Sequence, residues 1–327
     1  MSRRSCSSHR ENNTEGACQT HDCGQNVGMA ETEELSIITG EPITLQPGRT
    51  LTAWLDDEDA VAALLGRNQL PKDDLIAVHE RIAAARAARD ARPEFVPEEA
   101  VVLGDRKLLD EYSAMQHLKI SFAGVDWSVE MVDMSLVQSV QRSIKVGAVD
   151  ERIAPVLADR SKLWDFCLPA TRNEPPRGAF TDVDQRGFTV SSVNPNLRIA
   201  GTKIDNAEVQ TAAGPIRVQA IMFFVNFGNS YINVAHHRGR YFLRDGYHRV
   251  TGLLKAGFTT MPAVVVNLPG TYDDLMPGRQ VFSKEVSFSA RPPLVRDFLD
   301  DSVADDYRQP IVRKIIRIRS EEFVVQG

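Results

Sequence analysis

Five consecutive residues combine side chains that are suited to binding or transferring phosphate: Asp245, Gly246, Tyr247, His248 and Arg249, which we call the DGYHR box. A strand-like run, RYFL, precedes them, and a helix-like run follows. The first amides of a helix have no partner within that helix and, with the helix dipole, attract anions. Gly246 lets a ligand approach the backbone, Arg249 can bind phosphate through two hydrogen bonds, and His248 can donate or relay a proton. The box therefore suits a nucleotide phosphate.

A purely structural interpretation of the same residues stays open. Asp245 can simply cap the helix, Gly246 can allow the turn, and Arg249 can cover apolar surface with its stem. On spacing alone this interpretation is slightly the stronger one.

The segment after the box predicts an amphipathic helix. Apolar positions between Val250 and Gly257 recur at i, i+3, i+4 and i+7, which defines a buried face, and Gly257 is expected to mark the helix end. His248, Thr251 and Lys255 fall together on another face. The box therefore lies at the start of a helix that is anchored by its apolar side.

Residues 231–267 resemble the core of the ParB/sulfiredoxin superfamily. In that family a strand, a short hairpin, a second strand, a Gly-x-His-Arg or Gly-Glu-Arg-Arg box, a helix ending at Ala-Gly and a Pro-led strand follow in order. GYHR matches the box, KAG the helix end, and MPAVVV the following strand. The resemblance implies a ParB/sulfiredoxin-like nucleotide-binding fold, but it does not reach the first half of the chain.

The resemblance also implies roles for the box. It places a nucleotide (ATP, ADP or CTP) at Gly246, Tyr247, His248 and Arg249. Serine-kinase relatives with a similar box make Asp245 a candidate catalytic residue and Mg²⁺ ligand, with His248 as the second catalytic candidate.

This sequence departs from the family at two points, and both reduce the number of family functions that the resemblance can imply. Sulfiredoxins have a catalytic Cys at the position of Tyr247, so reduction of a sulfinic acid is excluded. Partition proteins have Glu-Arg-Arg where Tyr247, His248 and Arg249 stand, and they continue into a helix-turn-helix domain. Here the chain after the box reads as loops, a short helix and a terminal strand, without an evident DNA-reading helix.

Two functions from different classes are compatible with these residues. The first is a nucleotide-dependent phosphotransferase or hydrolase, which would need a second acidic residue facing the box; Asp182 and Asp184 are the candidates by composition. The second is a non-catalytic regulatory or interaction protein that keeps the box for nucleotide sensing or for structure. In either case the second substrate or partner is not identified by the sequence.

Composition sets the broad class of the protein. The chain has 327 residues, of which 43% are hydrophobic and 25% charged, with a formal net charge of -6. That length supports one large domain or two small ones. The mild acidity argues against a protein whose main task is to neutralise a nucleic-acid backbone. No apolar run approaches the roughly 20 residues of a membrane helix, so we expect a cytoplasmic protein without a membrane partner.

The sequence predicts an α+β fold in three parts. Residues 1–33 are expected to be a disordered tail, 34–172 a mainly helical lobe, and 173–327 the ParB/sulfiredoxin-like domain. Helical spacing is expected around 51–67, 71–92, 98–115 and 131–147, with a boundary in 171–187. In the second half, short β-rich runs alternate with turns. HHRG predicts a hairpin turn at Gly239, and QAIMFFVNF (219–227) a central strand covered on both faces.

The N-terminal tail carries most of the cysteines. Cys6, Cys18 and Cys23, beside His9 and His21, offer thiolate and imidazole ligands for zinc. The spacing matches no common zinc finger, and the polar composition is typical of disorder. Met29 is an alternative start of the protein.

The C-terminal run IVRKIIRIRS predicts a strand with cationic residues among isoleucines (Arg313, Lys314, Arg317 and Arg319). Such a run can line a phosphate-bearing cleft, but it is more often an edge strand with charges that prevent aggregation.

Overall fold

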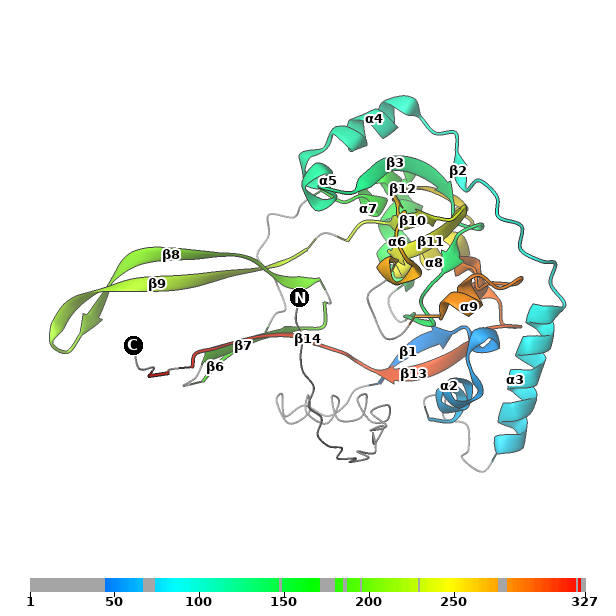
Figure 1. The fold of residues 1–327 in the computed structure, drawn as a ribbon, viewed down its shortest axis with the longest axis horizontal. Helices are drawn as coiled ribbons and strands as arrows, with labels where there is room; N and C mark the ends of the chain where they lie inside the picture. Colours follow the sequence, from blue (N-terminus) through cyan, green and yellow to red (C-terminus); the bar gives the residue numbers. More distant parts are fainter. Residues whose placement is uncertain are drawn as a thin grey trace, which may run out of the picture. The chain divides into compact units, whose positions relative to one another are not determined.

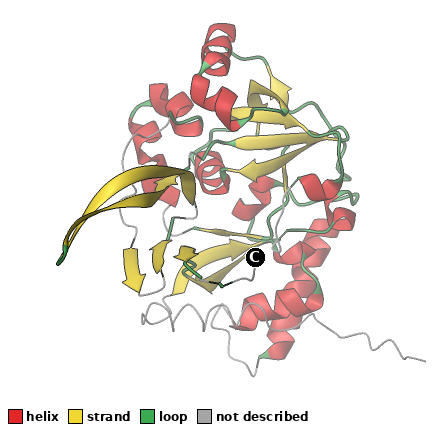
Figure 2. Cartoon of the chain, turned by 60° about the vertical axis from the view of Figure 1, so that its left-hand side comes forward, coloured by secondary structure: helices red, strands yellow, loops and turns green. Residues whose placement is uncertain are grey.

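The computed structural model describes residues 45–66, 74–146, 149–170, 180–184, 187–194, 196–228, 230–275, 281–321 and 323–324. The expected N-terminal tail, with its cysteines, the alternative start at Met29 and the zinc alternative, lies outside these ranges. Most of the expected boundary at 171–187 does so too. Helices and strands are mixed throughout the described chain, which confirms the α+β class (Figures 1 and 2).

Several helices, α2, α3, α4 and α9 among them, begin after a residue whose side chain caps them. Asp74 accepts a hydrogen bond from the Ala77 amide at 3.2 Å and so caps the longest of them. In the part of the chain described here, no helix is long and apolar enough to cross a membrane. The α-helices are α2 (Asp57–Val61), α3 (Leu75–Asp90), α4 (Arg106–Ala114), α5 (Gln116–Ser121), α6 (Val149–Ala158), α7 (Leu163–Cys167), α8 (Tyr247–Lys255) and α9 (Lys284–Ser287). Helical turns of other types are the 3-10 turns η1 (Thr52–Trp54), η3 (Arg160–Lys162), η4 (Tyr272–Asp274) and η5 (Val295–Leu299) and the π turn η2 (Ala62–Gly66).

The described strands form four sheets, ordered β2-β3-β12-β10-β11-β4, β13-β1-β5, β14-β7-β6 and β8-β9. Their bounds are β1 (Leu45–Thr50), β2 (Val101–Val102), β3 (Asp126–Asp133), β4 (Gln138–Ser139), β5 (Ser143–Lys145), β6 (Phe180–Asp184), β7 (Gly187–Ser192), β8 (Leu197–Thr211), β9 (Gly214–Phe227), β10 (Asn233–His237), β11 (Arg240–Asp245), β12 (Thr260–Asn267), β13 (Asp305–Pro310) and β14 (Lys314–Arg319).

The six-stranded sheet carries the box. β10 and β11 form an antiparallel hairpin, and Arg238 and Gly239 at its turn have φ values of 51° and 72°, which confirms the predicted turn. Helix α8 then leads to β12, which pairs parallel to β10 and antiparallel to β3. Six consecutive residues of β12 are buried, as a strand covered on both faces requires. The order of strand, hairpin, helix and strand agrees with the prediction for residues 231–267.

Helix α8 packs between α6 and η5. A side chain at Gly252 would lie 2.7 Å from Ile153 Cγ2 and 2.9 Å from Val149 Cγ1, so the glycine allows the two helices to approach closely. The largest fully buried side chains come from both halves of the chain, among them Leu51, Leu118, Met134, Phe242, Leu253 and Phe298.

Strands from both halves of the chain share two sheets. β1 pairs with β13 along its whole length and also with β5, while β3, from the first half, pairs with all of β12. The first half, expected to be mainly helical, thus also contributes strands β1 to β5. A boundary near residue 172 therefore separates segments that are hydrogen-bonded in the same sheets.

The helix predicted for 131–147 is wrong. This segment contains the end of β3, then β4 and β5. Its buried residues include the β-branched Val132, Val137, Val140 and Ile144, which fit a pleated surface better than a helix. Their spacing resembles a helical repeat, but pairing with distant strands decides the outcome.

The central strand predicted for 219–227 is also wrong. β9 pairs with β8 in a two-stranded ribbon, and Ile221 is 65% and Phe224 49% exposed. A continuous apolar run has the β-propensity of a buried strand, but it does not specify how many strands will cover it.

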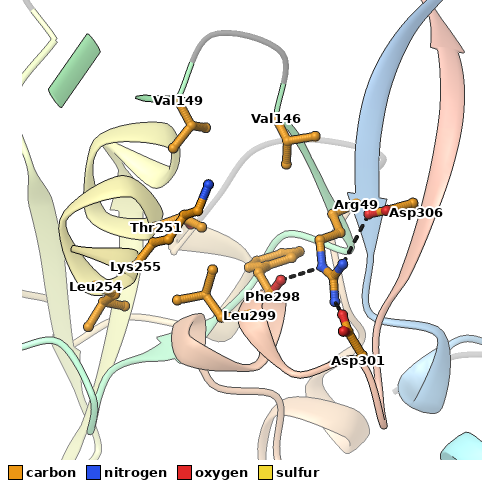
Figure 3. A pocket seen from close by; sticks show the side chains of 10 residues that line it. All are labelled: Arg49, Val146, Val149, Thr251, Leu254, Lys255, Phe298, Leu299, Asp301 and Asp306. Carbon is orange, nitrogen blue, oxygen red and sulfur yellow. Dashed lines mark hydrogen bonds and ion pairs between the residues drawn. The ribbon is translucent and has the colours of Figure 1, made fainter. Parts of the chain in front are cut away.

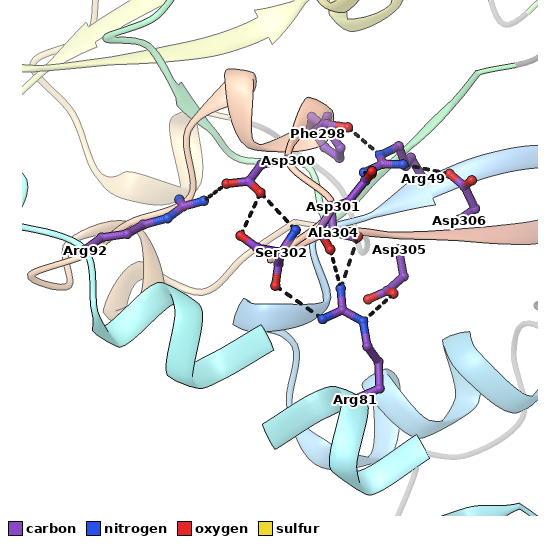
Figure 4. A network of polar contacts seen from close by, with 10 residues as sticks. All are labelled: Arg49, Arg81, Arg92, Phe298, Asp300, Asp301, Ser302, Ala304, Asp305 and Asp306. Carbon is purple, nitrogen blue, oxygen red and sulfur yellow. Dashed lines mark hydrogen bonds and ion pairs between the residues drawn. The ribbon is translucent and has the colours of Figure 1, made fainter. Parts of the chain in front are cut away.

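Three arginines from the first half hold one segment of the second half, between η5 and β13 (Figure 4). Arg49 forms ion pairs with Asp301 and Asp306 and donates to the Phe298 carbonyl. Arg81 pairs with Asp305 at 2.7 Å and also donates to the backbone carbonyls of residues 301, 302 and 304.

Arg92 supplies the most buried of these ion pairs. Its guanidinium lies 2.9 Å from a carboxylate oxygen of Asp297, whose side chain is 3% exposed, and 2.6 Å from one of Asp300. Burial raises the pKa of Asp297, although the Leu294 amide and Arg92 both favour its charged form. Arg92 therefore supplies the counter-charge for a carboxylate whose ionised form is disfavoured by burial.

We expect Arg92→Met to destabilise the protein by about 3 kcal/mol at pH 7, because it leaves a buried carboxylate without its counter-charge. The loss should shrink as the pH is lowered towards 4. In the variant the folded protein binds a proton on Asp297 at higher pH than the unfolded chain does, so protonation favours the folded state. Urea unfolding of both proteins between pH 4 and 7 measures this.

The matched control is Arg106→Met, which removes an exposed i, i+4 pair with Asp110. It should cost less than about 0.5 kcal/mol at any of these pH values. Equal losses in the two variants, or a loss in Arg92→Met that does not depend on pH, would contradict the role of Arg92.

Candidate functional site

The DGYHR box lies at the junction of β11 and α8, as the sequence predicts. Asp245 ends the strand, Gly246 has φ of 96°, and α8 begins at Tyr247 with no side-chain capping hydrogen bond. A Cβ at Gly246 would lie 3.0 Å from Ile232 Cγ1 and 3.1 Å from its Cα. Both the positive φ and this close contact require glycine. The turn therefore fixes where the positive end of the α8 dipole points.

Tyr247 points away from solvent and joins the box to the first half of the chain. Its side chain is buried, and its hydroxyl accepts hydrogen bonds from the amides of Val140 at 3.0 Å and Gln141 at 3.2 Å. The same hydroxyl donates to the Leu243 carbonyl at 2.6 Å. Burial raises the pKa of Tyr247 to about 12, although the hydrogen bonds from the two amides oppose the shift. The Tyr247 side chain is thus part of the core.

The Arg249 guanidinium contacts protein carbonyls. Nη1 donates to the Phe166 carbonyl at 3.0 Å and the Cys167 carbonyl at 3.2 Å, at the C-terminus of α7. Nη2 donates to Ser230 Oγ at 2.9 Å. Carbonyls at a helix C-terminus lack partners within the helix and attract cations. This geometry favours a structural role for the Arg249 side chain.

Ser230 links Arg249 to Asp245. Its hydroxyl donates to Asp245 Oδ2 at 3.0 Å, while Asp245 Oδ1 accepts the Gly246 amide at 2.6 Å. The carboxylate is therefore oriented from two sides, yet Asp245 remains exposed. Ser230 could not be recognised from the sequence, because a serine shortly before a strand gives no signal of a partner 15 residues away.

Asn233 adds a second acceptor beside Asp245. The two residues are paired across β10 and β11, next to an irregularity in the register. Among the described residues, Asn233 Oδ1 is buried without a hydrogen-bond partner. Asn233 thus occupies the position opposite Asp245, where the pairing of the two strands is irregular. The exposed Asp245 carboxylate is the acceptor of this pair that a ligand with hydroxyl groups can reach.

His248 is half-buried in the first turn of α8. The predicted face of α8 that it shares with Thr251 and Lys255 runs from the box along the helix. The predicted buried face is confirmed, because Val250 and Leu253 are fully buried. The predicted end is confirmed as well, because α8 stops at Lys255 and Gly257 has φ of 85°.

Asp245 alone does not make a metal site. In the ranges that the structure describes, no group of three His, Cys, Asp or Glu side chains could hold a metal ion. Mg²⁺ bound by one carboxylate takes its remaining ligands from substrate phosphates and water. A Mg²⁺ ion at Asp245 would therefore have to arrive with a nucleotide, where it would neutralise phosphate charge.

The other predicted site residues lie on a different sheet. Asp182 and Asp184 belong to β6, which pairs with β7, and their side chains lie outside what the structure describes. The C-terminal strand β14 is confirmed as an edge strand on the other side of β7, with Lys314, Arg317 and Arg319 exposed. Within the described ranges, neither strand pairs with the sheet that carries the box.

No protein-family model, curated protein or solved structure matches this chain.

We expect Tyr247→Phe to lower the free energy of unfolding by about 1–3 kcal/mol, because the buried amides of Val140 and Gln141 lose their acceptor. Chemical denaturation of the two proteins measures the loss. The folded variant should keep the nucleotide affinity of the parent, since the substitution leaves the backbone of the box unchanged. A variant as stable as the parent, or a stable variant that no longer binds, would show that the hydroxyl has another role.

Proposed function

We propose that this protein binds the phosphate groups of a nucleotide at the N-terminus of α8, in a ParB/sulfiredoxin-like unit formed by β10, β11, α8 and β12. The observation that carries the proposal is the left-handed turn at Gly246. It starts a nine-residue helix directly after β11, and Gly246, as the N-cap residue, has no side chain that could bond to the amides of the first turn. Anions are stabilised at such a position by the helix dipole and the amides of the first turn.

The residues of the box divide into two groups under this proposal. The side chains of Tyr247 and Arg249 hold the turn in place through the hydrogen bonds described above. The backbone of the first turn and the His248 side chain meet the phosphate, while Asp245 accepts hydrogen bonds from hydroxyl groups of the nucleotide. ATP, ADP and CTP are the candidate ligands.

A binding function without catalysis fits these contacts best, so we propose a nucleotide-sensing protein. The arginine that a phosphotransfer site would use on the transferred group donates to carbonyls of α7 and to Ser230. The tyrosine at the position of the family's nucleophile is buried. Neither side chain reaches a reacting group without breaking contacts that support the fold.

Phosphotransfer or nucleotide hydrolysis is a second candidate, and one observation favours it. Asp245 is exposed at the end of β11, and its carboxylate is oriented by Ser230 and the Gly246 amide. A carboxylate held in this way can orient an attacking hydroxyl, and His248 can stabilise charge or move a proton. Mg²⁺ held by Asp245 and the nucleotide would belong to this candidate.

We expect ATP, ADP or CTP to bind, and a nucleotide at 100 times its Kd to stabilise the protein by about 2.7 kcal/mol. Thermal melting with each nucleotide and with tripolyphosphate, with and without Mg²⁺, measures this. His248→Ala should weaken binding by about 1.5–3 kcal/mol, as for loss of a charged hydrogen bond. Lys119→Ala, a change on exposed α5, is the matched control and should bind like the parent.

Two results would decide against the proposal. If neither the nucleotides nor tripolyphosphate shift the melting temperature, the box is a structural turn. If His248→Ala binds like Lys119→Ala, the phosphate lies elsewhere. Release of inorganic phosphate by the parent but not by Asp245→Asn would replace the sensing function with the catalytic one.

A further inference from the structure

Strands β8 and β9 form a long two-stranded ribbon (Figure 1). β8 has 15 residues and β9 has 14, and they pair from Leu197 and Phe227 at the base to Thr211 and Gly214 at the tip. Among the strands that the structure describes, neither pairs with a third. A two-stranded hairpin is only marginally stable in water, whereas a sheet of three or more strands can be stable. The ribbon would therefore be stabilised by a further strand at one of its edges.

Apolar side chains are exposed on both faces of the ribbon. Ile204 and Ile221 lie directly opposite each other, and they are 67% and 65% exposed. Phe224 is 49% exposed, and it projects from the other face because successive residues of a strand alternate. A strand added at an edge provides neighbours on both faces at once. Packing of another surface against the ribbon would cover one face only.

The edge formed by β8 is protected against pairing. The strand has an irregular register between Ile199 and Gly201, and Lys203 forms an exposed ion pair with Asp205 at 2.6 Å. Charged side chains and bulges are the usual features that prevent an edge strand from pairing with another chain. The charged residues of β8 are Arg198, Lys203, Asp205 and Glu208.

The edge formed by β9 has none of these protections over most of its length. Residues 218–227, VQAIMFFVNF, contain no charged residue, no proline and no glycine. A long, apolar and uncharged edge strand is a template for pairing with another chain. The missing strand is therefore expected beside β9 and not beside β8.

The β9 strand is complementary to itself. When two copies of an uncharged run pair antiparallel about a two-fold axis, no like charges meet, and each apolar side chain gains an apolar or amide neighbour from the other copy. Arg217 precedes the run, so the two copies of this arginine would lie at opposite ends of the paired stretch. The resulting four-stranded sheet would have the order β8-β9-β9-β8. Its two outer edges would be the charged β8 strands, which stops growth at two copies.

We propose that the protein forms a two-fold symmetric dimer in which the β9 strands of two copies pair antiparallel along residues 218–227. The partner that this surface fits is thus a second copy of the same chain. The proposal does not rest on nucleotide binding at the start of α8.

The test is sedimentation of the full chain over a wide range of protein concentration, with a reductant present so that no disulfide links the copies. The parent should form dimers. Ile221→Lys should raise the dissociation constant of the dimer by about tenfold or more, because it places two like charges close to the two-fold axis.

The matched control is Ile204→Lys. It makes the same substitution at the residue directly opposite Ile221, on the same face and with nearly the same exposure, but on β8. Because β8 would lie on the outside of the four-stranded sheet, this variant should dimerise like the parent. Loss of the dimer in Ile221→Lys alone supports pairing through the β9 edge.

Four results would overturn the proposal. The parent remains a monomer throughout, or Ile221→Lys dimerises like the parent, so that any contact lies elsewhere. Equal loss in both variants would show that the ribbons pack through their faces. Growth of the parent beyond dimers would show that the β8 edges do not close the assembly.

Hydrogen exchange of the parent gives a second measurement that does not depend on how the variants fold. In the dimer both edges of β9 are hydrogen-bonded, but only one edge of β8 is. Residues 218–227 should therefore contain more slowly exchanging amides than an equal stretch of β8, and this excess should disappear on dilution to the monomer. Equal protection of the two strands in the dimer would contradict the pairing.

Discussion

The guanidinium of Arg249 joins three segments that the box depends on. It donates to the last carbonyls of α7, to Ser230 before β10, and through Ser230 it is connected to Asp245 at the end of β11. These contacts fix the first turn of α8 against segments about 80 and 20 residues earlier in the chain. Gly246 supplies the left-handed conformation without which the strand could not turn into the helix. A ligand at the helix start would thus meet a backbone already held in position.

The two halves of the chain are also held together by hydrogen bonds, strand pairing and ion pairs between residues that are distant in the sequence. The Tyr247 hydroxyl takes amide hydrogen bonds from Val140 and Gln141, and β3 covers the length of β12. Arg49, Arg81 and Arg92 of the first half hold the segment before β13. A cavity beside α8 is lined by residues of β1, the β5–α6 region, the η5–β13 region and α8 itself (Figure 3).

The sequence predicted features that depend on neighbouring residues. Gly239 and Gly257 supply positive φ values where a hairpin turn and a helix end need them, and the apolar repeat after the box identified the buried face of α8. Features that depend on distant partners were not predictable from local patterns. The segment 131–147 forms strands because β12 and β1 are available to pair with, and 219–227 stays partly exposed because one strand alone pairs with it.

In the candidate site, too, some features depend on neighbouring residues and others on distant partners. The position of the box was predicted, but the roles of its side chains depend on what surrounds them. On spacing alone the sequence favours a structural role for Arg249 only slightly over a contact with phosphate, and the position of the α7 carbonyls supports the structural role. Ser230 and Asn233 could not be recognised, since their importance comes from their position beside Asp245 in the folded chain.

The most direct test of this account is to measure thermal melting and nucleotide affinity on the same Arg249→Ala protein, with Arg106→Ala as the control for loss of one exposed arginine. If Arg249 holds the box in place, its removal should lower the melting temperature well below that of the control. The protein that remains folded should bind nucleotide as the parent does. A variant that melts like the parent but loses nucleotide affinity would contradict the account, because Arg249 would then act on the phosphate and not on α7 and Ser230.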